Sequence, residues 1–188
     1  MKVSDAIEKI RRDLADTLER LDRWFDLPVE PQTYKPRDGG WSIREVLEHI
    51  TLTNHFLMII IRKGRDKALK RYEQGKVPHR DTDLDRLATI AQPDAFPWDR
   101  PEHMEPTGNV PVEEVRATLH NQQKQCLDIL DELSAGQGTL YRVRMSVQNL
   151  GKIDLYQWIY FLVQHQKRHL VQLEKILQEW RREKAKKT

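Results

Sequence analysis

Four stretches of the chain carry apolar residues at three- and four-residue steps, the spacing that places side chains on one face of an α-helix. The first covers residues 3–25 and is followed by a proline-rich turn that a helix cannot enter. The second begins after Ser42, which can form a capping box with Glu45, and we expect it to end at Gly64. These patterns predict two long helices in the first third of the chain.

Two further helices are predicted in the second half of the chain. One covers residues 112–133 and starts after Pro111, a residue type favoured in the first turn of a helix. The other runs from residue 155 to about residue 182, with Asp154 as its N-cap. Before it, apolar and polar residues alternate over residues 141–147, which is typical of a short strand or an extended segment.

A long connector separates the second and third helices. Across residues 65–110 the helical spacing weakens and prolines interrupt regular structure, although residues 84–91 could form a short helix. Connectors of this length within a compact domain are lids, binding loops or crossovers, and the sequence leaves the choice open. The whole pattern predicts an all-α fold, a four-helix bundle with one long crossover connection after the second helix.

The composition fits one water-soluble domain spanning residues 1–188. The chain is 38% hydrophobic and 32% charged, and its longest apolar run, residues 56–61, is far shorter than the roughly 20 residues that cross a bilayer. Its first residues are charged rather than apolar, so we expect a cytoplasmic protein with no membrane partner. A formal charge of +3 lacks the basic excess of a nucleic-acid-binding protein, so no nucleic acid partner is expected. Cys126 cannot form an internal disulfide because it is the one cysteine, and its place on a helical apolar face predicts a core residue.

The fourth helix carries the most informative pattern in the chain. Its apolar face, which includes Leu162 and Leu173, is interrupted by His165 and His169. Residues four apart on a helix project from the same face with Cβ atoms about 5–6 Å apart, so the two imidazoles could bind one divalent ion through ring nitrogens. A third ligand must come from another helix, and His49 on the inner face of the second helix is the best candidate.

An ordinary structural role is the alternative for this pair. A single histidine on an apolar face is usually a hydrogen-bonded core residue. The ring nitrogens of two histidines at this spacing are harder to supply with hydrogen-bond partners, and each buried nitrogen without a partner costs about 1–3 kcal/mol. The spacing alone leaves both interpretations open. The other histidines are expected at the surface or in the connector: His55, His79, His103 and His120.

Two motifs resemble the DinB/YfiT-like family of metalloenzymes. The first is WSIREVLEH at residues 41–49, and the second is LGKIDLYQW at residues 150–158 followed by HQKRHLVQ at residues 165–172. The resemblance implies a four-helix bundle that binds a divalent ion, often nickel or zinc, through three histidines. Those ligands correspond here to His49, His165 and His169. Some relatives are S-transferases that use bacillithiol or mycothiol, another is a mycothiol-dependent maleylpyruvate isomerase, and dimers are common, so a homodimer is expected.

Three functions follow from such a site. Three neutral nitrogen ligands leave a coordination position open, as in catalytic sites, so the first hypothesis is a metal-dependent transferase that joins a low-molecular-weight thiol of the bacillithiol type to an electrophilic small molecule. The second is a metal hydrolase, which ranks lower because Glu45 belongs to the helix cap and Glu48 precedes a ligand and so points elsewhere. The third is a non-catalytic metal-binding stress-response protein stabilised by its ion.

Three more residues are candidates for contacts around the ion or the substrate. Arg168 and Gln172 flank His169 and could orient its ring or bind a substrate anion. Trp98 lies in the connector, where an aromatic residue could line a pocket or belong to a lid.

Overall fold

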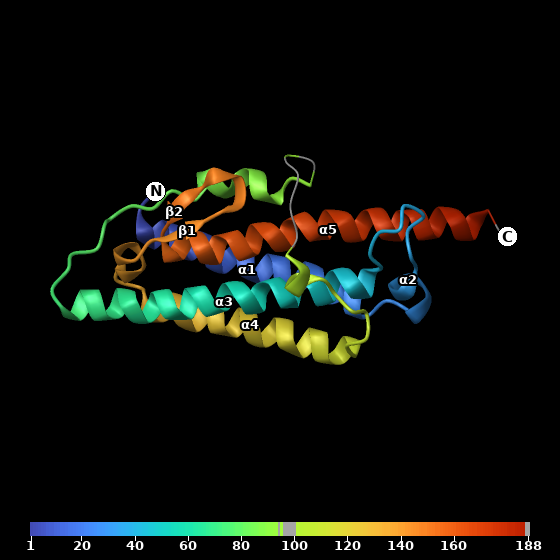
Figure 1. The fold of residues 1–188 in the computed structure, drawn as a ribbon, viewed down its shortest axis with the longest axis horizontal. Coiled ribbons are helices and arrows are strands. Elements are labelled where there is room, and N and C mark those ends of the chain that lie inside the picture. The colour runs from blue at the N-terminus through green and yellow to red at the C-terminus, as the bar shows by residue number, and fades with distance from the viewer. Residues whose placement is uncertain (94, 96–100, 187–188) are drawn as a thin grey trace.

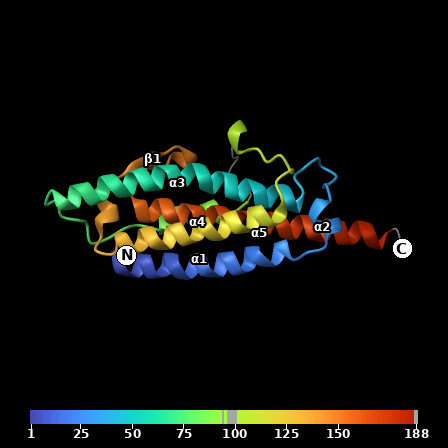
Figure 2. The same cartoon turned by 90° about the horizontal axis from the view of Figure 1, so that it is seen from below.

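The computed structural model describes residues 1–93, 95 and 101–186. Four long helices form a bundle (Figure 1): α1 (Val3–Phe25), α3 (Ile43–Glu73), α4 (Val112–Glu132) and α5 (Leu155–Ala185). Helices α1 and α3 each pack against both α4 and α5, so α1 and α3 lie on opposite sides of the bundle, as Figure 2 shows. The predicted all-α class is confirmed.

The direction of the helices explains the long connector. Helices α1 and α5 run one way along the bundle, and α3 and α4 run the other way (Figure 1). Because α3 and α4 are parallel neighbours, the chain must travel back along the bundle between them. The connector forms two 3₁₀ helices on the way: η1 (Asp85–Ala91), which packs on α5, and η2 (Glu102–Met104), which packs on α3.

The predicted end of the second helix at Gly64 is wrong, because α3 continues to Glu73 and the connector therefore starts later than residue 65. Gly64 is buried inside the helix, where a Cβ atom would lie 2.5 Å from Leu155 Cδ2 and 3.3 Å from Tyr141 Cδ1. This glycine is thus a close-packing position between α3 and the start of α5. A lone glycine in a helical pattern can mark either the end of a helix or a close-packing position within it. Which of the two applies depends on the segments that pack against it.

Short elements complete the fold. The prolines after α1 are compatible with a small helix, α2 (Val29–Thr33), because Pro31 falls in its first turn. The alternating segment forms β1 (Val143–Met145), which pairs antiparallel with β2 (Gly151–Ile153), a strand that the sequence pattern did not reveal. The hairpin turns through η4 (Val147–Asn149), and η3 (Gln137–Leu140) precedes it.

The apolar core consists of two clusters, one toward each end of the bundle. Between them lies a layer of buried polar side chains. In this layer Asn54 Nδ2 donates to Gln122 Oε1 at 3.0 Å, and Gln122 Nε2 donates to the carbonyl of Thr51 at 2.9 Å. His49 of α3 and the two histidines of α5 belong to the same layer, so the packing concentrates buried polar groups where the two helices meet.

Across the described residues, no helix combines the length and apolar character that a bilayer crossing requires.

Candidate metal centre

Three histidines from α3 and α5 converge inside the bundle. His49, His165 and His169 are all buried, at 4%, 3% and 8% exposure. One ring nitrogen from each lies within 4.8 Å of the others, and the Nε2 atoms of His165 and His169 are 3.0 Å apart. The ring centroid of His49 lies 5.4 Å from that of His165 and 4.9 Å from that of His169. The three residues predicted from spacing and resemblance are therefore brought together, and they could hold a metal ion.

The spacing of the two Nε2 atoms on α5 fits a shared divalent ion. Metal–nitrogen bonds of about 2.0–2.1 Å place two ligand nitrogens about 2.9 Å apart at a right angle and about 3.3 Å apart at a tetrahedral angle. The 3.0 Å between the Nε2 atoms of His165 and His169 falls in this range. Two neutral imidazoles in contact each bring a lone pair as well as a proton, so a common cation satisfies both lone pairs at once.

Hydrogen bonds on the opposite side of two rings set their orientation. His49 Nδ1 donates to the carbonyl of Met104 at 2.8 Å, and His169 Nδ1 donates to Gln172 Oε1 at 2.8 Å. An amide oxygen only accepts, so the proton is on Nδ1 in both rings and Nε2 presents its lone pair. Partners of this kind fix the tautomer and the angle of metal-binding histidines. Gln172 thus contacts a candidate ligand as the sequence suggested, whereas Met104 acts through its backbone and gave no sequence signal.

The third ring is kept neutral. Burial, together with the charges of His169, His49 and Arg168, holds the pKa of His165 well below its ordinary value of 6.5. At neutral pH this imidazole is therefore uncharged, which is the form of histidine that binds a metal ion. The indole of Trp41, which opens the first motif, covers His49 with its ring centroid 4.6 Å away.

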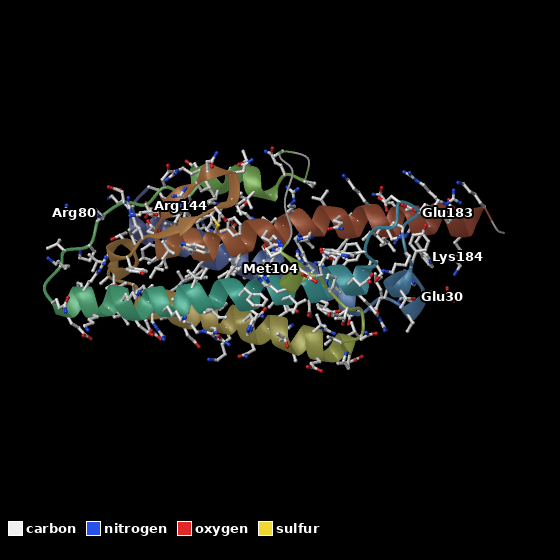
Figure 3. All side chains as sticks on the ribbon, in the orientation of Figure 1. Glu30, Arg80, Met104, Arg144, Glu183 and Lys184 are labelled. Carbon is white, nitrogen blue, oxygen red and sulfur yellow. The ribbon has the colours of Figure 1, made fainter. Side chains whose placement is uncertain are left out.

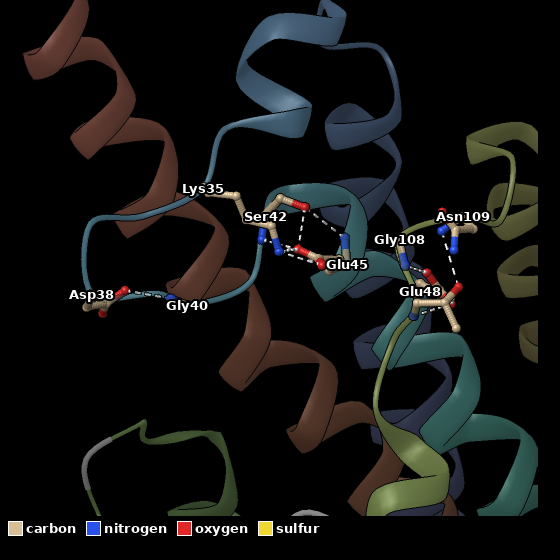
Figure 4. A network of polar contacts seen from close by, with 9 residues as sticks. Lys35, Asp38, Gly40, Ser42, Glu45, Glu48, Gly108 and Asn109 are labelled. Atoms are coloured by element: carbon tan, nitrogen blue, oxygen red, sulfur yellow. Dashed lines mark hydrogen bonds and ion pairs between the residues drawn. The ribbon is translucent and has the colours of Figure 1, made fainter.

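A segment of the connector, residues 101–109, forms a strap across α3 (Figure 4), and its Met104 carbonyl reaches His49. The carboxylate of Glu48 holds it: Oε1 accepts from the backbone and hydroxyl of Thr107 at 2.9 and 3.0 Å, and Oε2 accepts from the backbone of Gly108 at 2.7 Å. Because the strap carries the Met104 carbonyl, Glu48 supports the orientation of His49 indirectly. Glu48 thus points away from the candidate ion, as expected, and Glu45 is engaged in the cap of α3 with Ser42.

A cavity of about 550 Å³ opens beside the three histidines. Its wall is mainly apolar and aromatic, with a smaller number of polar groups. None of the described residues that line it is an aspartate or a glutamate. The lining consists of Trp41, His49, Thr53, Leu57, Ile60, Pro101, Met104, Arg144, Met145, Ser146, Val147, Trp158, Phe161, His165, Arg168, His169 and Gln172.

The remaining sequence candidates have distinct places. Arg168 lines the cavity, and its guanidinium donates to the backbone carbonyls of Gln92 and Pro93, so it ties the connector to α5. Trp98 lies outside the described residues. Cys126 is a core residue, as predicted: it is 2% exposed, and burial raises the pKa of its thiol to about 12.

The other histidines stay apart from this site. All four are exposed, as predicted: His55, His79, His103 and His120.

Comparison with known proteins agrees with this geometry. The family model described as the DinB superfamily matches residues 6–173. The chain belongs to the DinB superfamily. This DinB-superfamily protein is also similar to the uncharacterized protein YuaE of Bacillus subtilis (strain 168), with 25% identity over 166 residues that cover 84% of this chain and 91% of YuaE. No solved structure gave a significant match. The resemblance carried by the two histidine-bearing motifs is thus confirmed at the level of the family.

Proposed function

We propose that this protein is a divalent-metal-dependent transferase that joins a low-molecular-weight thiol, of the bacillithiol type, to an electrophilic small molecule. The observation that carries the proposal is the convergence of three buried imidazoles at the wall of an apolar cavity. His49, His165 and His169 would hold the ion, with zinc or nickel the best matches to a nitrogen donor set. A divalent ion in such a site supplies Lewis-acid chemistry that makes a thiol easier to deprotonate near neutral pH.

The protein's own residues supply orientation and exclusion of water. Met104 and Gln172 fix the rings of His49 and His169 through their Nδ1 protons. The apolar wall, with Trp158 and Phe161, favours an organic substrate over bulk water. In the transfer the sulfur forms a bond to an electrophilic carbon, and the bond from that carbon to a halide or an epoxide oxygen breaks with its electron pair. The thiol proton passes to solvent in the first case and to the opened epoxide oxygen in the second.

Hydrolysis is the weaker alternative for this site. A water nucleophile usually needs a carboxylate base within hydrogen-bond reach. The described lining of the cavity offers none, and the two glutamates nearest in sequence to His49 are held by other partners: Glu45 by the α3 cap and Glu48 by the strap.

Elemental analysis and a turnover assay test the proposal together. We expect close to one divalent ion per chain in protein purified without chelator, loss of that ion in His169→Ala, and retention in His55→Ala, an exposed histidine that serves as the matched control. With metal bound, turnover of chlorinated or epoxide electrophiles should require an added low-molecular-weight thiol. A metal-free wild type would overturn the proposal. Turnover without thiol would favour hydrolysis, and inactivity of the loaded protein across the panel would favour a non-catalytic metal-binding role.

A further inference from the structure

The charged residues that are described in the cavity wall are all cationic. Two arginines, Arg144 and Arg168, line it together with the three histidines, and no described lining residue carries a negative charge. Apolar walls lower the local dielectric constant, so charges in such a cavity are screened less than at an open surface. Bringing a divalent ion to three neutral ligands adds positive charge to the same space. The cavity is therefore electrostatically suited to a ligand that brings a negative group of its own.

The two arginines differ in their contacts with the rest of the protein. Arg168 donates from both terminal nitrogens to the carbonyls of Gln92 and Pro93, which commits its guanidinium to the connector. Arg144 extends from β1, on the hairpin beside the start of α5 (Figure 3), and is exposed. No ion pair joins it to any residue that the structure describes. Its Cα partner across the hairpin is Lys152, another cation. Among the described residues, Arg144 is thus a cavity-lining cation with no ion-pair partner.

The hairpin that carries Arg144 is tied to the rest of the fold by hydrogen bonds. Arg86 Nη2 donates to the carbonyl of Leu150 at 2.7 Å, and Thr89 Oγ1 donates to Gln148 Oε1 at 3.1 Å. Both bonds tie the hairpin to η1, which packs on α5. The residues that follow Arg144, at positions 145–147, also line the cavity, so this end of the hairpin forms part of the wall.

We infer that the cavity binds an organic molecule with an apolar body and a carboxylate group, and that the guanidinium of Arg144 binds the carboxylate. The apolar and aromatic wall takes the body, and the forked donors of arginine match the two oxygens of a carboxylate. The inference names the substrate class of the proposed transferase site and in that sense rests on the proposed function. Arg144 would determine specificity rather than take part in bond making.

Matched probes test this inference by direct binding. The probes are 4-phenylbutyrate and its neutral amide, 4-phenylbutanamide, titrated calorimetrically into the full chain. One series uses protein treated with chelator and a second uses protein loaded with zinc. The variant is Arg144→Gln, and the control is Lys152→Gln, which removes the same charge from the facing position of the hairpin and does not line the cavity. Circular dichroism establishes that each variant is folded.

The chelator-treated series isolates the arginine from the ion. We expect the wild type to bind the carboxylate about tenfold or more tighter than the amide, the gain expected for a charge-assisted hydrogen bond. Arg144→Gln should remove most of that preference and leave amide binding within about twofold, whereas Lys152→Gln should keep the preference. Equal binding of the two probes by the wild type would overturn the inference. So would equal losses in the two variants, an equal loss of amide binding, or failure of both probes to bind.

The binding test of Arg144 and the test of the proposed transferase activity can fail independently of each other. The chelator-treated series involves neither metal nor thiol, so a protein that never turns over a thiol can still show the Arg144-dependent preference. A loaded protein that turns over thiols but binds both probes equally would refute the role of Arg144 alone.

Discussion

Glu48 offers the sharpest test of how the connector supports the metal centre. Its side chain is 4% exposed, and its two oxygens accept three hydrogen bonds from Thr107 and Gly108 in the strap. The variant Glu48→Gln keeps the size of the side chain but replaces one oxygen by an amino group. The remaining oxygen can still accept from Thr107, while the amino group then faces the N–H of Gly108, and two donors cannot bond to each other.

The expected cost follows from that one lost bond. A hydrogen bond to a charged acceptor contributes about 1.5–3 kcal/mol, so the strap should open more easily by about that amount. Looser attachment of the strap also loosens the Met104 carbonyl that holds the ring of His49. Loss of such support around a ligand typically lowers metal affinity by about 10- to 100-fold.

Two measurements check the reasoning. Hydrogen exchange followed by mass spectrometry should show faster exchange in the strap at Thr107 and Gly108, and zinc titration should show weaker binding. Glu174→Gln, at an exposed position on α5, is the matched control and should change neither. Unchanged exchange at Gly108, or zinc affinity within about twofold of the wild type, would refute the coupling between strap and site.

Three further predictions concern packing and charge. Gly138→Ala should lower the free energy of unfolding by about 1–3 kcal/mol, because the added Cβ would lie 2.7 Å from the ring of the fully buried Tyr156. Urea denaturation measures this change, and an unchanged midpoint would mean that the ring moves aside without cost. Cys126 should react with a disulfide reagent only in denaturant, since burial raises the pKa of its thiol to about 12; rapid modification of the native protein would contradict this packing. The hydrogen bond from Arg116, with a smaller contribution from His120, lowers the pKa of Asp22 below 3.8, so its stabilising effect is present above about pH 4 and is lost as the pH falls through the lowered pKa. Asp22→Asn should therefore cost less than about 1 kcal/mol at pH 7, and this cost should shrink as the pH falls below 3.8. A difference that grows in acid would show the opposite sign.

The sequence determined the helices and the faces on which the ligands lie. The apolar spacing placed α1 at Val3–Phe25, and capping residues placed the starts of α3 and α5 at Ser42 and Asp154, because caps and amphipathic spacing depend on neighbouring residues only. The spacing of His165 and His169 by one helical turn likewise fixed their common face. Their juxtaposition with His49 was a hypothesis until the packing of α3 against α5 brought the three rings together.

The tertiary structure alone decided the surroundings of that site. Gly64 was expected to end a helix, and it proved to be a contact with Leu155, because a glycine signals a break or a close approach equally well. The Met104 carbonyl could not be anticipated, since every residue has one and only the path of the chain brings a particular one to His49. Arg144 lines the cavity for the same reason. Its position beside α5 results from the pairing of β1 with β2 and from the hydrogen bonds to η1. These contacts join segments that are distant in sequence, so local sequence patterns do not predict them.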